Sequence, residues 1–207
     1  MRMKATRDCQ IHNHPQSALK TMKLEFATAT ESDAPELAAL HRAVAEALTL
    51  RHGQGFWSSS QTERGILVNM RNPKFSRTLI ARNGNRIVGT LRLHTKRPWA
   101  IDPAYFTPAT HPLYLTGMAV HPTHQSQGVG RLLMQQAEAI ARDPGHHSWE
   151  LPNPADAIRL DAFDAPAGAG PFYAKCNYRE LAHVIYRNNP LVYFERVLVP
   201  TSLVSSL

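Results

Sequence analysis

The chain has 207 residues, of which 43% are hydrophobic and 19% are charged, and its formal net charge is +7. A chain of this length forms one domain by default, and the apolar fraction is too high for a mostly disordered protein. The two cysteines, Cys9 and Cys176, are too few for a disulfide scaffold, and no apolar run reaches the ~20 residues of a membrane span. We therefore expect a cytoplasmic protein with no membrane partner.

The basic charge is uneven along the chain. Residues 1–23 contain five Lys or Arg side chains and a single Asp, so more than half of the excess charge lies there. Residues 1–22 show no apolar period and are expected to be a disordered extension, with the folded domain over residues 23–207. Because that domain is nearly balanced in charge, the sequence predicts no specific nucleic-acid partner.

The first elements are read from apolar periodicity. Residues 24–30 alternate apolar and polar side chains, which predicts a strand. A helix follows to His52, with Asp33 as its cap and apolar residues at helical spacing. After a Gly/Ser-rich loop, a second helix is predicted over residues 61–70.

A hairpin comes next, and the remaining elements form the second half of the domain. Its two strands, 78–82 and 86–93, flank a glycine-containing turn at 83–85. The proline-rich stretch 98–112 is expected to be irregular and exposed. The other predicted elements are a strand at 113–120, a helix from 129 to about 143, an insertion at 144–157, a strand at 158–163, a short segment at 172–175 and two final strands near 178–187 and 191–199.

The most informative segment runs from the strand at 113–120 into the helix that starts near Val129. Gly128 and Gly130 allow close backbone approach and leave amide N–H groups without helical partners. Those donors and the helix dipole favour a phosphate or pyrophosphate. The dinucleotide pattern G-x-G-x-x-G is not met, because Leu133 occupies its third position, and the lysine of a P-loop is also absent.

Four short strings resemble motifs of the GNAT N-acetyltransferase superfamily. GMAVHP at 117–122, followed by QSQGVGR at 125–131, is similar to its acetyl-CoA motif. IRLD at 158–161, followed by FYAKCNY at 172–178, is similar to its second motif. The resemblance covers residues 24–199. It implies an α+β fold, in which a mixed, mostly antiparallel sheet of about six to seven strands is flanked by helices and splayed at the cofactor site.

The resemblance also implies a function: transfer of an acetyl group from acetyl-CoA, without a metal, to an amine of an unidentified small molecule or peptide. In the family, strand backbone groups hold the pantetheine arm, and the loop after the strand wraps the pyrophosphate. Two C-terminal strands often form a homodimer. The cofactor-binding residues implied here are Met118, Ala119, Val120, Gln125, Ser126, Gln127, Gly128, Val129, Gly130, Arg131, Asp164 and Tyr173.

The resemblance gives an acid and leaves the base open. Tyr173 matches the tyrosine that protonates the departing thiolate in many relatives, and a phenol held by the fold can supply that proton. Many relatives use a glutamate near the fourth strand as the base, and residues 113–116 contain no carboxylate. The candidates that remain are His111, Tyr114, Asp161, Glu31, Asp33 and a water molecule.

The acceptor site is expected between residues 50–70 and the loop 94–112. Aromatic and histidine side chains of such loops can line a substrate pocket. The residues that we expect there are Phe56, Trp57, His94 and Trp99.

Three positions depart from the family pattern. Pro166 stands where the family often has Asn, Asn177 stands where Gly is usual, and the insertion at 144–157 carries the pair His146 and His147. The altered segment 164–171 and the missing strand glutamate keep a second hypothesis open, a catalytically weak CoA-binding module that acts as a sensor.

Overall fold

A single seven-stranded sheet organises the molecule. The computed structural model describes residues 23–142 and 154–198. The strand order is β1-β2-β3-β4-β5-β7-β6, and every neighbouring pair is antiparallel except β4 and β5, which are parallel. The predicted sheet of six to seven mostly antiparallel strands is therefore confirmed. The strands are β1 (Leu24–Thr28), β2 (Ser76–Asn83), β3 (Arg86–His94), β4 (Pro112–Val120), β5 (Ala157–Phe163), β6 (Arg179–Tyr186) and β7 (Asn189–Val197).

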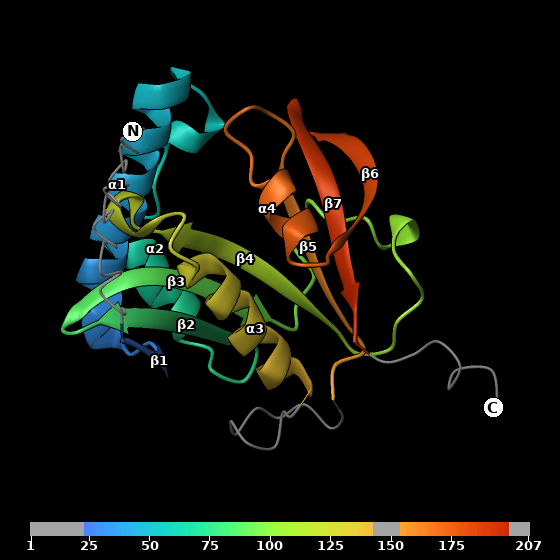
Figure 1. Cartoon of the computed structure of the whole chain (residues 1–207). Helices are drawn as coiled ribbons and strands as arrows, with labels where there is room; N and C mark the ends of the chain where they lie inside the picture. Colours follow the sequence, from blue (N-terminus) through green and yellow to red (C-terminus); the bar gives the residue numbers. More distant parts are fainter. Residues whose placement is uncertain (1–22, 143–153, 199–207) are drawn as a thin grey trace, which may run out of the picture.

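Helices cover both faces of the sheet (Figure 1). The helices α1 (Ala34–His52) and α2 (Glu63–Met70) pack on one face around Leu37 and Ile66. The helices α3 (Val129–Arg142) and α4 (Gly170–Lys175) pack on the other face. In α3 the buried side chains recur every three or four residues, which is the pattern that makes a helix amphipathic. Those of α3 are Val129, Leu133, Met134, Ala137, Ile140 and Ala141.

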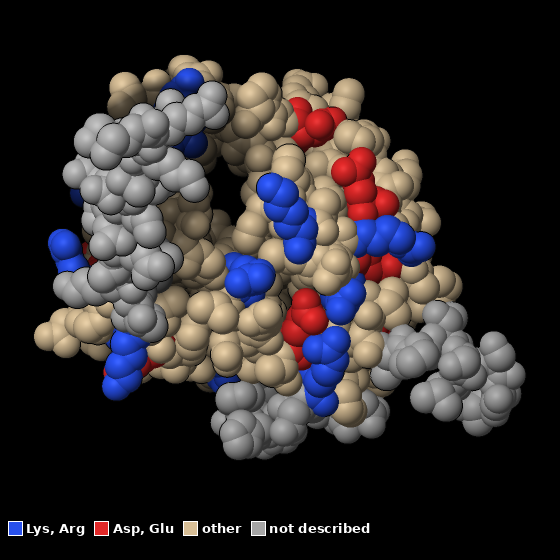
Figure 2. All heavy atoms as spheres, in the orientation of Figure 1, with Lys and Arg blue, Asp and Glu red and all other residues tan. Residues whose placement is uncertain are grey.

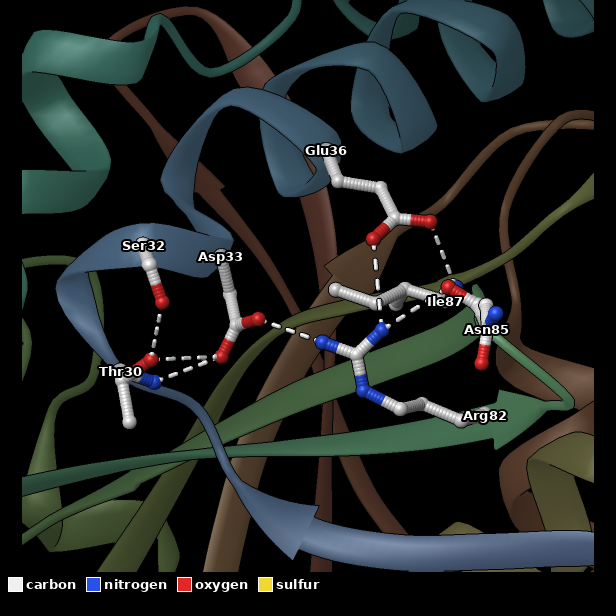
Figure 3. Close-up of polar contacts among 7 residues, drawn as sticks. All are labelled: Thr30, Ser32, Asp33, Glu36, Arg82, Asn85 and Ile87. Carbon is white, nitrogen blue, oxygen red and sulfur yellow. Dashed lines mark hydrogen bonds and ion pairs between the residues drawn. The ribbon is translucent and has the colours of Figure 1, made fainter.

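An arginine of β2 fixes the start of α1 on the sheet (Figure 3). Arg82 Nη2 lies 2.5 Å from Asp33 Oδ1, and its Nη1 lies 3.4 Å from Glu36 Oε2. The other Glu36 oxygen accepts a hydrogen bond from the Ile87 amide at 2.8 Å. The prediction that Asp33 caps α1 with its side chain is wrong. Its carboxylate accepts from Thr30 instead and pairs with Arg82, which ties the helix to two strands.

Element boundaries differ from prediction by a few residues, for local reasons. The strand predicted at 24–30 ends at Thr28. The second helix starts at Glu63 rather than Gln61, because the Thr62 hydroxyl accepts from Gly65 N and caps it. The predicted extension 1–22, residues 143–153 of the predicted insertion, and residues 199–207 lie outside the described residues.

The proline-rich segment 98–112 is irregular, as predicted, but the prediction that it is exposed is wrong for two side chains. Ile101 and Phe106 are buried against Tyr114 and Tyr193. The Tyr193 hydroxyl donates to the carbonyl of Ala100. The segment therefore packs on the β4 and β7 side of the sheet, because it supplies apolar groups that the prolines alone do not reveal.

Neither a membrane-spanning helix nor a metal-binding cluster is found among the described residues. No helix between residues 23–142 or 154–198 is long and apolar enough to cross a membrane. In the same ranges, no three His, Cys, Asp or Glu side chains gather in a way that could hold a metal ion.

Candidate functional site

The sheet opens between its two parallel strands. β4 and β5 pair only where Pro112–Tyr114 lies beside Ala157–Arg159. Beyond that point, β4 continues on β3 and β5 continues on β7, so the strands diverge (Figure 1). Gly117 in β4 has φ +61, and the β3–β4 register shifts beside it. This glycine-dependent irregularity exposes one edge of β4, where backbone groups lack a neighbouring strand.

The opening between β4 and β5 forms a cleft of about 340 Å³. Its walls come from β4, β5, the later turns of α1, and the loop around the short turn Phe56–Ser58. Val44 and Leu48, two apolar residues of the predicted α1 stripe, are only half-buried and line this cleft. The space-filling view shows the molecule hollowed between the α1 side and the α4 side, with basic side chains over α4 and the start of α3 (Figure 2).

The loop between β4 and α3 presents a cluster of backbone donors. Ser126 and Gly128 have φ of 61 and 85, so the chain turns sharply before the helix. The first helical bond runs from Leu132 N to Gly128 O. Within the described chain, none of the amide N–H groups of residues 126–131 donates to a protein acceptor. Such donors at a helix N-terminus suit an anion.

Two glutamines brace this loop. Gln125 Nε2 donates to the Val120 carbonyl at 3.0 Å, and Gln127 Nε2 donates to the Thr123 carbonyl at 2.8 Å. Both side-chain amides therefore stabilise the conformation of the loop. The Gln125 side chain also occupies the carbonyl of Val120, and Ala119 pairs with Thr90 of β3, so the strand backbone open to a ligand is that of Met118.

The donor loop lies at the edge of the cleft. A Cβ added to Gly130 would lie 3.1 Å from the Phe172 ring and 3.2 Å from the Met118 methyl group. Met118 is itself a cleft residue. The glycine thus allows α3 to approach α4 and β4 closely, and it places the anion-binding donors beside the opening in the sheet.

Tyr173 of α4 reaches the cleft from the α3 side of the sheet. Its side chain is buried and lines the cleft, and within the described residues its hydroxyl has no hydrogen-bond partner. Burial, with smaller contributions from Asp161 and Cys176, raises the pKa of Tyr173 above its ordinary value of 10.0. The phenol is therefore protonated at neutral pH and can donate that proton.

Asp161 of β5 is the carboxylate of this cleft. It lines the cleft, as Tyr173 does, and no described residue forms an ion pair with it. Burial raises its pKa above the ordinary value of 3.8. A desolvated carboxylate without a cationic partner is a stronger proton acceptor than an exposed one, which suits a general base.

The other base candidates do not line the cleft. Tyr114 is buried against Tyr193 and Ile101, and the His111 amide bonds Asp156 at the far end of β4. Glu31 is exposed ahead of α1, and Asp33 is paired with Arg82. Of the side chains named from the sequence, the geometry therefore retains Asp161.

The acceptor loops are only partly as predicted. Phe56 and Trp57 line the cleft, and the Phe56 ring stacks on Phe163 at 6.0 Å. The prediction that Trp99 lines the acceptor site is wrong. Its side chain is 90% exposed and borders a separate hollow beside β6. His94 does not line the cleft. Its Nε2 lies 3.2 Å from the hydroxyl of Thr116, which does.

The cofactor assignment of Asp164 also needs correction. Its carboxylate lies 2.7 Å from His183 Nδ1 on β6 and borders a hollow with Pro171 and Glu180. The chain turns at Asp164 after β5, so this side chain leaves the cleft that Asp161 enters. We therefore remove Asp164 from the cofactor-binding residues.

His41 is a cleft residue that sequence reasoning missed. It lies on α1 between Leu37 and Val44, on the face that also carries Leu48, and it lines the cleft. Burial, followed by the charge of Arg92, lowers its pKa to about 4. A histidine within an apolar helical stripe was the available signal.

Comparison with known families agrees with this architecture. Residues 39–178 match the family described as "Acetyltransferase (GNAT) family". That range includes the donor loop, Asp161 and Tyr173, and it spans more than half of the chain. The chain belongs to the GNAT acetyltransferase family, and the resemblance inferred from its motifs is confirmed. A search of curated protein sequences finds no significant match.

Solved structures share the fold at low sequence identity. A GNAT-family protein from Desulfovibrio desulfuricans is 13% identical with a TM-score of 0.62, covering 86% of this chain and 100% of its own. A protein from Salmonella typhimurium, solved with its cofactor acetyl-CoA, is 16% identical with a TM-score of 0.58, covering 89% and 99%. An N-acetyltransferase from Thermoplasma acidophilum in complex with coenzyme A is 14% identical with a TM-score of 0.60, covering 83% and 98%.

Proposed function

We propose that the protein transfers an acetyl group from acetyl-CoA to an amine, by direct attack within a ternary complex. One observation carries the proposal: Tyr173 and Asp161 line the opening in the sheet, and the loop with the free amides of residues 126–131 adjoins it at Met118. Structures of similar fold hold acetyl-CoA or coenzyme A. The acceptor is a small molecule or peptide.

The residues of the loop fit a ligand that carries a pyrophosphate. The six amides from 126 to 131 provide unpaired donors, and Arg131 in the first turn of α3 adds a positive charge. The free edge of β4 at Met118 provides a strand-like donor and acceptor for an amide-containing arm. Gln125 and Gln127 support the loop from behind.

Proton transfers can be assigned to two side chains. Acetyl-CoA, when bound, would supply the acetyl thioester, with coenzyme A as the leaving group. Asp161 takes the proton that the amine loses as the new C–N bond forms. Tyr173 donates its hydroxyl proton to the sulfur as the C–S bond breaks. The proton count balances, since Asp161 gains one and Tyr173 loses one, and both exchange with solvent after release.

Binding of acetyl-CoA can be tested at Gly128. Its φ is +85, and a Cβ there would meet nothing within 4 Å, so Gly128→Glu adds a carboxylate beside the anion-binding amides. We expect the Kd for acetyl-CoA in calorimetry to rise at least about tenfold. Gly84→Glu is the matched control, because Gly84 also has positive φ and open space, at a hairpin turn. Equal affinities for the two variants would contradict the placement of the site.

The role of the tyrosine is tested by Tyr173→Phe. With an acceptor found by screening amines for release of free thiol, we expect kcat to fall about 100-fold, while the Kd for acetyl-CoA changes little. Tyr178→Phe is the control, because Tyr178 is also buried and packs on Tyr173, but it does not line the cleft. Equal kcat values for both variants would show that Tyr173 is not the acid.

The sensor hypothesis makes a different prediction for the same experiments. It requires acetyl-CoA to bind without thiol release for any amine, and Tyr173→Phe to behave as the wild type. One of its reasons, the missing glutamate near β4, loses force because Asp161 supplies a carboxylate from β5. A cytoplasmic location, a homodimer through the C-terminal strands, and the absence of a nucleic-acid or membrane partner stay predictions.

A further inference from the structure

Arg92 of β3 borders a small recess of the cleft. It pairs with Thr116 of β4 across the sheet, on the face covered by α1 and α2. The recess, about 20 Å³, is large enough for a single small polar group. His41, Gln61 and Gly117 line both the recess and the main cleft, so the recess lies directly beside the cleft.

The guanidinium group has no carboxylate partner among residues 23–142 and 154–198. Its Nε donates to the Thr116 hydroxyl at 3.2 Å, and no described residue accepts from its two terminal nitrogens. Two other arginines that are buried or half-buried have carboxylate partners. Arg82 pairs with two carboxylates, and Arg159 pairs with Glu195. An unpaired cation in a partly desolvated position is costly, so it calls for an anion from outside the protein.

A chain of hydrogen bonds orients this arginine. His94 Nδ1 lies 2.7 Å from the Lys96 carbonyl, which can only accept, so Nδ1 carries the proton. The His94 Nε2 is then an acceptor, and the Thr116 hydroxyl donates to it at 3.2 Å. The Thr116 oxygen in turn accepts from Arg92 Nε. The three residues hold the guanidinium by one edge and leave its terminal donors unengaged.

The neighbouring histidines do not supply a charge of either sign. Burial, followed by the charge of Arg92, lowers the pKa of His41 to about 4, and the same two causes lower that of His94 to about 4. Both rings are therefore neutral at pH 7. Arg92 is left as the cation of the recess.

Arg92 and Asp161 lie on opposite sides of the opening. Tyr114 pairs with Arg159 where β4 and β5 still touch, so Thr116 and Asp161 follow two residues later on the same face. Arg92, Thr116 and Asp161 therefore form a row across three strands, with the opening between the last two. A small molecule in the opening can meet a cation at one end and a proton acceptor at the other.

We propose that Arg92 binds a carboxylate of the acceptor, so that the acceptor is a small amine of the amino-acid class. This inference rests on the proposed acetyl transfer. The two terminal nitrogens of Arg92 match a carboxylate in the bidentate arrangement that arginine favours. The amine of the same molecule then points toward Asp161 and the donor loop. His94 and Thr116 act as positioning residues.

The test compares L-amino acids with their α-carboxamides as acceptors, measuring release of free thiol from acetyl-CoA. We expect the wild type to show a KM about 10- to 100-fold lower for the acid of the best pair, because a charge-assisted contact is lost in the amide. Arg92→Met is expected to raise the KM for the acid by about 10- to 100-fold and to raise the KM for the amide much less, so that the two values converge. Its Tm is expected to equal or exceed that of the wild type, since an unpaired cation is removed.

Other outcomes overturn the inference. Equal KM values of the wild type for acids and amides, or turnover of carboxylate-free amines alone, would refute it while leaving acetyl transfer in place. An equal rise in both KM values for Arg92→Met would assign the residue a structural role. Acetyl-CoA binding in calorimetry without turnover of either class would refute this inference and the proposed function together. A wild type that does not bind acetyl-CoA would refute the proposed function, and the inference that rests on it would fall with it. If Arg92→Met does not fold, the comparison of acid with amide on the wild type decides.

Discussion

Asp161→Asn is expected to lower kcat by about 100-fold or more at neutral pH, with little change in the Kd for acetyl-CoA. The amide has the shape of the carboxylate, and it cannot take the proton that the amine must lose. Because burial raises the pKa of Asp161, wild-type kcat should rise with pH through a value above 3.8. That rise should be missing from the variant, and steady-state rates from pH 4 to 9 measure it.

The same substitution is expected to stabilise the protein. A carboxyl group whose pKa is raised on folding binds its proton more tightly in the folded state, so ionisation costs stability as the pH rises above the ordinary Asp value. Asp161→Asn should therefore melt at a higher temperature than the wild type at pH 7. The two proteins should converge near pH 3, where the carboxyl group is neutral in both states. Thermal melts at the two pH values check this.

Asp156→Asn provides a carboxylate control outside the cleft. Asp156 accepts from the amides of Thr110 and His111, so its loss should affect stability rather than the pH dependence of kcat. If Asp161→Asn turned over as fast as the wild type, Asp161 would not be the base. A water molecule on the β4 backbone would then be the better candidate.

The features that the sequence predicted correctly are those whose residues lie in one continuous segment of the chain. The glycines and polar residues at 125–131 lie next to each other along the chain, so the donor loop and the start of α3 could be predicted from local pattern. The hairpin of β2 and β3 follows from two alternating strands around a short turn. Tyr173 was reached through the family motif that surrounds it.

The acceptor side could not be read in this way, because its residues come from four separate elements. Arg92, His41 and Asp161 are brought around one opening only by the register of the strands and the packing of α1. A local sequence pattern encodes neither the register nor the packing. Trp99 was wrongly predicted to line the acceptor site because aromatic residues in irregular loops are typical of pocket linings. In the fold, that loop packs beside β7 instead.

A buried ion pair, on the same face of β5 as Asp161, holds this loop. Arg159 of β5 and Glu195 of β7 are paired across the sheet, with Nε and Oε1 3.1 Å apart, and both side chains are buried. The second Glu195 oxygen accepts from the Thr107 amide at 3.2 Å, and Arg159 donates to the Thr107 carbonyl. The guanidinium also lies over the Phe106 ring at 5.0 Å. The pair thus joins the sheet to the segment 98–112.

Glu195→Gln is therefore expected to lower the free energy of unfolding by about 3–5 kcal/mol, because it leaves the Arg159 cation buried without a counter-charge. Denaturant titration measures the loss. Glu138→Gln, which removes the shared partner of Arg142 and Arg196, two more exposed arginines, is the control and should cost at most about 1 kcal/mol. The double variant Arg159→Met with Glu195→Leu should recover most of the stability, since apolar groups of similar size need no partner. A loss below about 1 kcal/mol for Glu195→Gln would mean that water reaches Arg159 and that the loop is held by Ile101 and Phe106 alone.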